Sequence, residues 1–184
     1  MKGKTLITII SVVIVGGIIL IASLTTSREQ ITSQPVISVG DEAPEATFTT
    51  IQGDERMLSE FQGQKVMFWF LATWCPSCIS AAQVLEKNNE ILKGMTVIAL
   101  KTHRNAGFPG PTIKEFAQTH APELLEAENW IWGNASEEAT QIYNPRNLPD
   151  IYFLIDEAGI VRAIDGAPAA TINNIVEFAT ESVE

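Results

Sequence analysis

The stretch VMFWFLATWCPSC, residues 66–78, decides the fold. Its first seven residues are a continuous apolar run of strand length, which is typical of a strand buried on both faces of a sheet. From Cys75 to Leu92 the apolar residues recur at helical spacing, and Gly94 then ends the helix. Residues 96–102, TVIALKT, form a second continuous apolar run. A strand, a helix and another strand in this order predict a parallel crossover unit of right-handed sense.

Downstream of this unit, the pattern predicts three more helices and a β-hairpin. The helices are expected at residues 112–120, 134–143 and 171–183. Asn134 is the expected N-cap of the second of them, because Glu137 follows at the spacing of a capping box. Apolar strands at residues 151–155 and 160–164 flank a turn, and the second alternates as an edge strand does. The whole pattern predicts an α/β fold with a central mixed β-sheet flanked by helices.

The amino-terminal segment has the character of a membrane anchor. No charge occurs between Lys4 and Arg28, and residues 6–24 are almost entirely apolar. At about 1.5 Å per helical residue, such a run crosses the roughly 30 Å of hydrocarbon in a bilayer. Lys2 and Lys4 precede it, so the positive-inside rule keeps the N-terminus in the cytoplasm and places the rest outside. A cleaved signal peptide is the alternative, but its apolar region is usually shorter.

The chain therefore divides into an anchor, a tether and one domain. Residues 1–27 are the expected cytoplasmic stub and single transmembrane helix of the cytoplasmic membrane. Residues 28–38 are mostly polar and lack periodicity, as a tether does. Residues 39–184 show no repeat and no second change of composition, so we expect one domain there, on the extracytoplasmic face.

Charge excludes one class of partner. Twelve Lys and Arg stand against twenty-two Asp and Glu, which gives a net charge of −10. A protein this acidic repels phosphate backbones, which disfavours sequence-independent binding to nucleic acids. We therefore expect no nucleic-acid partner.

The chemistry is carried by the only two cysteines, Cys75 and Cys78. A bridge between them closes too short a loop to stabilise the fold. Residues three apart on a helix have Cβ atoms about 5–6 Å apart, so this pair can form and break a disulfide. At the first helical turn, free backbone N–H groups and the helix dipole favour the thiolate of Cys75, and Pro76 suits the first helical position. We expect an exposed Cys75 to attack and a deeper Cys78 to resolve the mixed disulfide.

Metal binding is the competing use of a cysteine pair. A structural zinc site needs two more Cys or His ligands, and only His103 and His120 exist. Copper delivery by Cys75, Cys78 and His103 is the alternative function, because soft thiolates bind Cu(I). The proline turn between the cysteines favours redox cycling instead. We therefore expect no metal and no cofactor other than the redox-active disulfide itself.

Two segments around these motifs are similar to one protein family. Residues 39–78 and 135–161 resemble the membrane-anchored, thioredoxin-like thiol-disulfide oxidoreductases of the TlpA and ResA type, in the redoxin/AhpC-TSA superfamily. The positions in register within the first segment are Gly40, Ala43, Pro44, Leu58, Ser59, Phe61, Gly63, Lys65, Trp74 and Cys75. The resemblance implies a thioredoxin fold over residues 39–184 and disulfide exchange with client proteins. It also implies a membrane redox partner that recycles the cysteine pair.

The same resemblance implies a docking surface. By that match Pro149 is the family's cis-proline, and Leu148 and Pro149 lie against the Cys75 sulfur. A cis bond there would leave the backbone of Leu148 free to pair with an extended substrate segment. Trp74 and Pro76, on either side of Cys75, are expected to complete this surface.

The chain departs from the family pattern where the proton acceptors usually stand. Many thioredoxins have a buried carboxylate at the position of Trp69, and ResA-type proteins often have a glutamate at that of Ala81. Both acids are absent here. Asp150, directly after Pro149, is the candidate that substitutes for them as the proton acceptor of Cys78.

Peroxidase chemistry is not expected. The peroxiredoxin relatives place a threonine three residues before their cysteine and a proline seven before it, and Ala72 and Phe68 stand there in this chain. The sequence leaves the direction of exchange open, because reductase and oxidase differ only in reduction potential.

Overall fold

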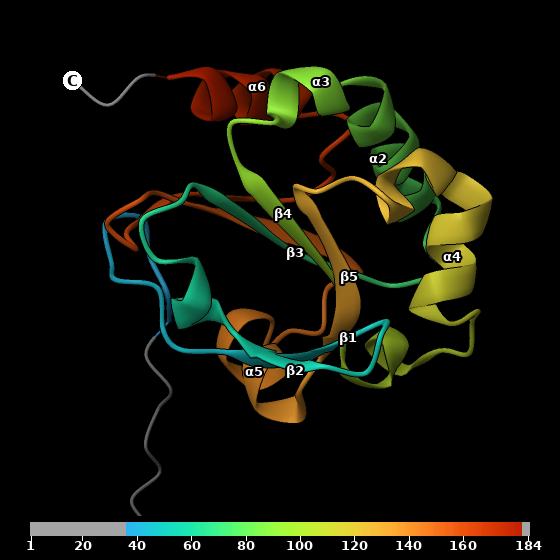
Figure 1. Ribbon diagram of the computed structural model, residues 1–184. Helices are drawn as coiled ribbons and strands as arrows, with labels where there is room; N and C mark the ends of the chain where they lie inside the picture. The colour runs from blue at the N-terminus through green and yellow to red at the C-terminus, as the bar shows by residue number, and fades with distance from the viewer. Residues whose placement is uncertain (1–35, 182–184) are drawn as a thin grey trace, which may run out of the picture. The chain divides into compact units, whose positions relative to one another are not determined.

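The structure of the chain is a computed structural model that describes residues 36–181 (Figure 1). The predicted membrane helix and nearly all of the tether lie outside the described residues. Within residues 36–181, no helix has both the length and the apolar character needed to cross a bilayer.

A seven-stranded mixed sheet occupies the centre of the described region (Figure 1). The strands are β1 (Thr47–Thr50), β2 (Glu55–Met57), β3 (Val66–Leu71), β4 (Thr96–Lys101), β5 (Trp130–Ala135), β6 (Asp150–Ile155) and β7 (Val161–Asp165). Their order across the sheet is β2-β1-β5-β4-β3-β6-β7. Strands β3, β4 and β5 are parallel, whereas β6 is antiparallel to β3 and β1 to β5. The predicted α/β fold with a mixed sheet is confirmed.

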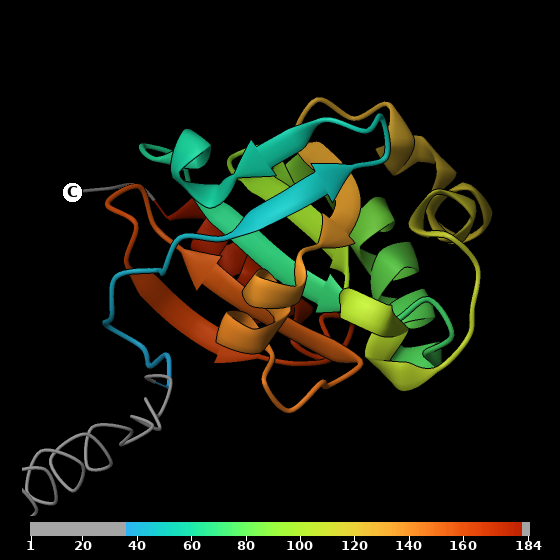
Figure 2. The ribbon, with the colours of Figure 1, turned by 90° about the horizontal axis from the view of Figure 1, so that it is seen from below.

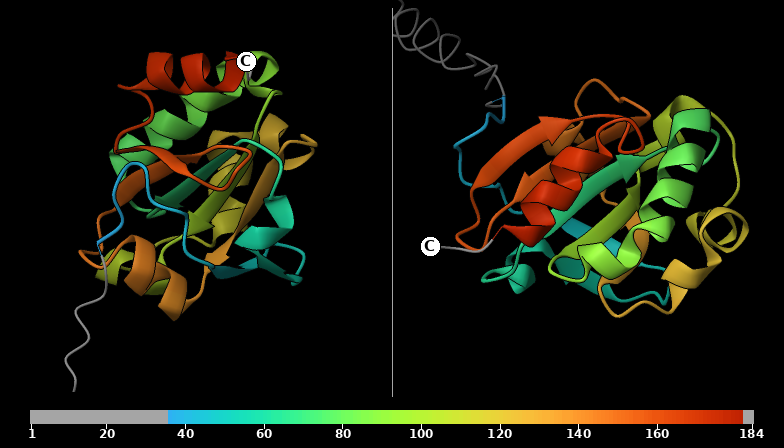
Figure 3. Two further views of the ribbon diagram at one scale, coloured as in Figure 1. Left: turned by 90° about the vertical axis from the view of Figure 1, so that its left-hand side faces the viewer. Right: turned by 90° about the horizontal axis from the view of Figure 1, so that it is seen from above.

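Helices cover both faces of this sheet. The α-helices are α2 (Pro76–Lys87), α3 (Asn89–Leu92), α4 (Ile113–His120), α5 (Glu137–Tyr143) and α6 (Ile172–Thr180), and the 3-10 helices are η1 (Leu58–Phe61), η2 (His103–Gly107) and η3 (Pro122–Leu125). Helices α2 and α6 lie across the strands on one face (Figure 3), where they share a core with α3 and α4. Helix α5 packs on the opposite face with η1 (Figure 2).

The position of strand β3 between two helical layers explains why its sequence is apolar throughout. All six of its residues are buried. Met67, Trp69 and Leu71 point into the core beneath α2 and α6, and Phe68 and Phe70 into the core beneath α5. Because side chains alternate along a strand, a strand with a helical layer on each face needs apolar residues at every position.

The structure corrects the predicted elements at residues 130–136. Asn134 lies in strand β5, and the N-cap of α5 is Ser136, whose Oγ accepts the backbone N–H of Ala139 at 2.9 Å. The strand forms there because Trp130 and Trp132 are buried and Asn134 pairs with Thr49 of β1. The cross-strand partner outweighs the local capping pattern.

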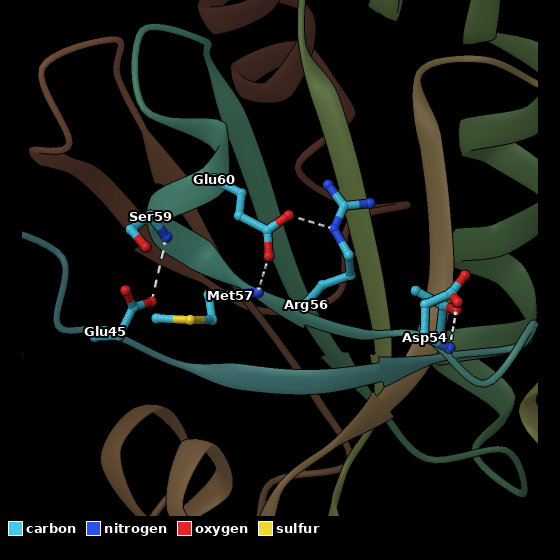
Figure 4. Close-up of polar contacts among 7 residues, drawn as sticks. Glu45, Asp54, Arg56, Met57, Ser59 and Glu60 are labelled. Carbon is cyan, nitrogen blue, oxygen red and sulfur yellow. Dashed lines mark hydrogen bonds and ion pairs between the residues drawn. The ribbon is translucent and has the colours of Figure 1, made fainter.

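A short hairpin at the amino-terminal end of the domain is a second element that the sequence analysis missed. Strands β1 and β2 pair antiparallel, and η1 follows directly. Glu60 of η1 accepts the backbone N–H of Met57 at 2.7 Å and also pairs with Arg56, while Glu45 accepts the backbone N–H of Ser59 at 3.2 Å (Figure 4). These contacts fasten the edge of the sheet on the far side from β7.

A fragment starting near residue 37 is expected to fold without the anchor. Every helix and strand that the structure describes begins at or after Thr47. The fragment should be monodisperse and should show one cooperative thermal transition by circular dichroism. A broad, non-cooperative transition would mean that the domain needs residues from the anchor or the tether.

Candidate active site

The cysteine pair lies where strand β3 gives way to helix α2. Cys75 is the N-cap of α2, with extended backbone angles of −85° and 123°, and Pro76 is the first helical residue. The predicted position of Pro76 is therefore confirmed, and its missing N–H costs no hydrogen bond there. Cys78 is one turn further along the same helix.

The two thiols differ in their surroundings. Both cysteines are free, Cys78 is fully buried and Cys75 is 4% exposed. The prediction that Cys78 is the deeper residue is confirmed, but the expectation of an exposed Cys75 is wrong. Cys75 packs into the core beneath α2, and its Sγ lies 3.0 Å from the hydroxyl of Ser77. Cys75 therefore presents only a small accessible surface to a client disulfide.

Cys78 is held as a thiol. Its Sγ donates a hydrogen bond to the carbonyl oxygen of Pro149 at 2.8 Å. Burial raises the pKa of the Cys78 thiol well above its ordinary value, and the negative charge of Asp150 raises it further. Cys78 therefore needs a proton acceptor before it can act as a nucleophile.

Asp150 places a carboxylate beside that thiol. It is the first residue of β6 and pairs with Leu71 of β3. The indole N–H of Trp69 donates to Asp150 Oδ1 at 2.8 Å, and Oδ2 is buried without a hydrogen-bond partner among the described residues. Burial raises the pKa of Asp150, while the Trp69 hydrogen bond and the nearby side chains of Ser77 and Cys78 oppose that rise. Sequence reasoning missed the role of Trp69, because the pair forms only across strands β3 and β6.

The raised pKa of Asp150 has a measurable effect on stability. An aspartate in the unfolded chain titrates near pH 3.9. Because the folded value is higher, this group favours folding most below about pH 3.9 and loses that contribution as pH rises through the folded value. As pH rises from acidic to neutral, the free energy of unfolding of the parent protein should therefore fall relative to that of Asp150→Asn. Urea unfolding of both proteins, once at acidic and once at neutral pH, measures this change. The same difference in free energy of unfolding at the two pH values would contradict the prediction.

The structure contradicts the prediction of a cis-proline. Among residues 36–181 no peptide bond is cis, so the Leu148–Pro149 bond is trans. The side chain of Asn144 accepts the N–H of Leu148 at 2.8 Å and donates to its carbonyl oxygen at 2.8 Å. This clamp fixes the loop, so the backbone of Leu148 is not free to pair with a substrate as expected. The carbonyl oxygen of Pro149 accepts the N–H of Ala72 and the thiol of Cys78 instead.

The predicted docking residues differ in exposure. Pro76 is exposed, and Trp74, Leu148 and Pro149 are half-buried. The indole N–H of Trp74 donates to the carbonyl oxygen of Asn105 at 2.8 Å. Asn105, in the loop after β4, is a residue that the sequence analysis did not single out.

The geometry does not assemble the copper site considered as the alternative. His103 faces Glu137, with Nε2 3.8 Å from Oε2, rather than the two thiols. In the part of the chain that the structure describes, no three His, Cys, Asp or Glu side chains are grouped as metal ligands. The arrangement instead provides two neighbouring thiols and one buried carboxylate, which are the groups that disulfide exchange uses.

Comparisons with known proteins agree with this chemistry. Residues 39–164 match the AhpC/TSA family. The thiol-disulfide oxidoreductase ResA of Geobacillus kaustophilus is 28% identical over 138 residues, which cover 72% of each chain. The thioredoxin-like protein YneN of Bacillus subtilis is 29% identical over 132 residues, which cover 70% of this chain and 71% of that protein.

Solved structures share the fold. A thioredoxin-like protein from Aeropyrum pernix aligns with a TM-score of 0.57 at 23% identity, covering 71% of this chain and 87% of that one. The thioredoxin domain of a thiol-disulfide oxidoreductase from Bacteroides vulgatus aligns with a TM-score of 0.53 at 19% identity, covering 76% and 99%. These likenesses confirm the predicted thioredoxin fold.

Proposed function

The chain belongs to the AhpC/TSA family and is a thioredoxin-like thiol-disulfide oxidoreductase, and from this we propose that Cys75 and Cys78 are its redox centre. The observation that carries the proposal is the buried carboxylate of Asp150 beside the thiol of Cys78, at the start of α2. A structural cysteine pair would need no such group. Trp74, Pro76, Leu148 and Pro149 surround the pair and form the docking surface for client proteins.

The first half of the reaction uses Cys75. In the reductive direction, its thiolate attacks one sulfur of a client disulfide, and the second client sulfur leaves as a thiolate. A mixed disulfide between Cys75 and the client results. The position of Cys75 at the N-terminus of α2 supports this role, because the helix dipole and the free N–H groups stabilise negative charge there.

The second half uses Cys78 and Asp150. Cys78 gives its proton to Asp150 Oδ2, and the resulting thiolate attacks the sulfur of Cys75. The bond between Cys75 and the client breaks, so the client leaves with two electrons as a dithiol and the protein becomes a disulfide. The reverse sequence oxidises a client dithiol. Trp69 positions the carboxylate by holding Oδ1, which leaves Oδ2 without a partner.

We place this activity on the outer face of the cytoplasmic membrane. The support is the sequence of residues 1–27, in which Lys2 and Lys4 precede an uncharged apolar run. A second membrane protein would then return the pair to its starting redox state. Alkaline phosphatase fused to the carboxyl end should be active in bacterial cells, because that enzyme folds only where disulfides form. An inactive fusion that is nevertheless expressed would contradict this location.

Reduction of a protein disulfide tests the function directly. The reduced protein should convert insulin disulfides to thiols, and its own pair should become a disulfide in the same mixture. Mass spectrometry counts the alkylatable thiols before and after the reaction. Copper titration of the same sample is the comparison, and tight Cu(I) binding without any exchange would overturn the proposal.

A further inference from the structure

The loop between β4 and α4 has a strained backbone. Arg104, Asn105 and Ala106 have φ angles of 54°, 53° and 55°, so three consecutive residues other than glycine adopt the left-handed conformation. Such residues are unfavourable individually and persist only where surrounding contacts impose them. Strain of this kind is concentrated at functional sites, and the contacts of this loop indicate which site it serves.

Asn105 ties this loop to the two residues that precede Cys75. It is buried, and its Oδ1 accepts the backbone N–H of Thr73 at 2.8 Å. Its carbonyl oxygen accepts the indole N–H of Trp74 at 2.8 Å, and its Nδ2 donates to the carbonyl oxygen of Phe108 at 3.0 Å. The side chain of Asn105 therefore links Thr73 to the backbone of Phe108, and its backbone carbonyl oxygen holds Trp74.

The loop presents an aromatic ring to solvent. Phe108 is 61% exposed, and its ring centroid lies 5.0 Å from that of Trp74, edge to face. The other large apolar side chains exposed within residues 36–181 are Val36, Val39, Met57 and Ile91, and none of these is aromatic. The core does not require Phe108 at this position, whereas an exposed aromatic ring next to a reactive site is typical of a contact residue.

The same edge of the molecule is basic in an otherwise acidic protein. Residues 101–114 contain Lys101, Arg104 and Lys114 and no acid, although the chain has a net charge of −10. The next loop, residues 144–149, contributes Arg146 and no acid. The two loops adjoin, because a Cβ on Gly107 would lie 4.0 Å from Nδ2 of Asn147. The acids nearest to these segments are Glu115 and Asp150, which directly follow them in the chain, and Glu137 of α5, whose Oε2 lies 3.8 Å from Nε2 of His103.

We propose that Trp74, Arg104, Phe108 and Arg146 form a recognition rim for an extended client segment with an apolar residue beside its cysteine and acidic residues further out. Trp74 directly precedes Cys75, so a residue next to a client cysteine bonded to Cys75 can contact Trp74, and Phe108 extends that apolar surface. The arginines attract the acidic side chains and orient the segment. The proposal rests on the proposed exchange at Cys75.

Two matched peptides test the rim with the full-length reduced protein. Each contains one cysteine activated as a mixed disulfide with thionitrobenzoate and a leucine beside it, and they differ in having glutamate or lysine at the outer positions. Release of thionitrobenzoate reports attack by Cys75. For each variant, the rate with a peptide is divided by the rate of the same variant with a small uncharged disulfide, which gives a normalised rate. The glutamate peptide should react about tenfold faster than the lysine peptide, and high salt should reduce this preference.

Matched variants locate the preference on the rim. Phe108→Ser should lower the normalised rate with either peptide about tenfold. Ile91→Ser removes an apolar side chain of comparable exposure on α3 and should lower neither rate. Arg146→Glu should abolish the preference for glutamate, whereas Lys87→Glu, an identical charge reversal near the end of α2, should preserve it. Phe108→Tyr should keep most of the parent rate because the aromatic contact remains.

The outcomes separate this proposal from the proposed function. If the parent protein reacts with neither the small disulfide nor the peptides, the proposed exchange function is wrong, and the recognition rim that depends on it is overturned as well. If the small disulfide reacts but the peptides do not differ, only the recognition rim is overturned. Equal losses in the rim variants and in their controls would overturn it as well. Binding to anionic lipid vesicles that requires Phe108, without any peptide preference, would identify a membrane contact instead.

Discussion

Replacing Cys78 by serine is expected to trap client proteins as stable mixed disulfides, whereas replacing Cys75 by serine should abolish exchange. In the first variant Cys75 still attacks, but no second thiol can release the client. In the second, the remaining thiol is fully buried and its pKa is raised by burial and by Asp150, so it attacks nothing. The adducts are measured by non-reducing electrophoresis and mass spectrometry after acid quenching.

The variant that lacks both cysteines is the control for this experiment, and it should form no adduct. Faster alkylation of Cys78 than of Cys75 at neutral pH would reverse the two roles. Because Cys75 is only 4% exposed, alkylation by a bulky reagent should be slower than alkylation by a small one. That comparison measures how accessible the Cys75 sulfur is in solution.

Replacing Asp150 by asparagine is expected to slow release of the client by about a hundredfold near neutral pH, the usual contribution of a positioned general base. Asparagine is close to the same size and can still accept the indole N–H of Trp69, but it cannot take the proton of Cys78. Release is measured by forming the mixed disulfide first and then following the free client thiol. The formation step, which depends on Cys75, should change much less.

The pH dependence distinguishes a base from a merely structural residue. In the parent protein, the release rate should rise as Asp150 ionises, above the ordinary aspartate range because burial raises its pKa. In Asp150→Asn that rise should disappear, and only the dependence on the Cys78 thiol should remain. Asp54→Asn, at an exposed turn between β1 and β2, is the matched control and should behave as the parent does. A rise that persists in Asp150→Asn would mean that solvent deprotonates Cys78.

The sequence predicted the elements that one pattern determines and missed those that depend on a distant partner. Strand β3 and helix α2 follow from continuous and helical apolar spacing, and the cysteines sit at their junction as expected. The single helix predicted over residues 75–92 is divided at Asn88 into α2 and α3. Strand β5 did not, because Gly133 and Asn134 interrupt its apolar run. Gly133 is required there, since a Cβ would lie 2.5 Å from the carbonyl oxygen of Thr49. The pairing with β1 on one side and with β4 on the other makes that segment a strand.

The site shows the same division. The proposed reactive pair and the neighbouring carboxylate of Asp150 were both predicted, from local spacing and from family resemblance, and the structure places Asp150 next to Cys78. The partner of Asp150 did not, because Trp69 reaches it only through the register in which Leu71 pairs with Asp150. The expected cis bond failed for a related reason. The side chain of Asn144 satisfies both backbone groups of Leu148, and that clamp is visible only once the loop is folded.

The hydrogen bond between Trp69 and Asp150 makes the two positions interdependent, so a protein with its acid at position 69 instead of 150 would differ from this one at both positions. Moving the carboxylate from one strand to its neighbour takes two substitutions. One intermediate would bury two carboxylates together, where each disfavours ionisation of the other, and the second would have none. Neither intermediate keeps a single acid with an indole to hold it. Trp69 and Asp150 therefore act as a unit, and replacing either one alone should disturb the site more than exchanging both together.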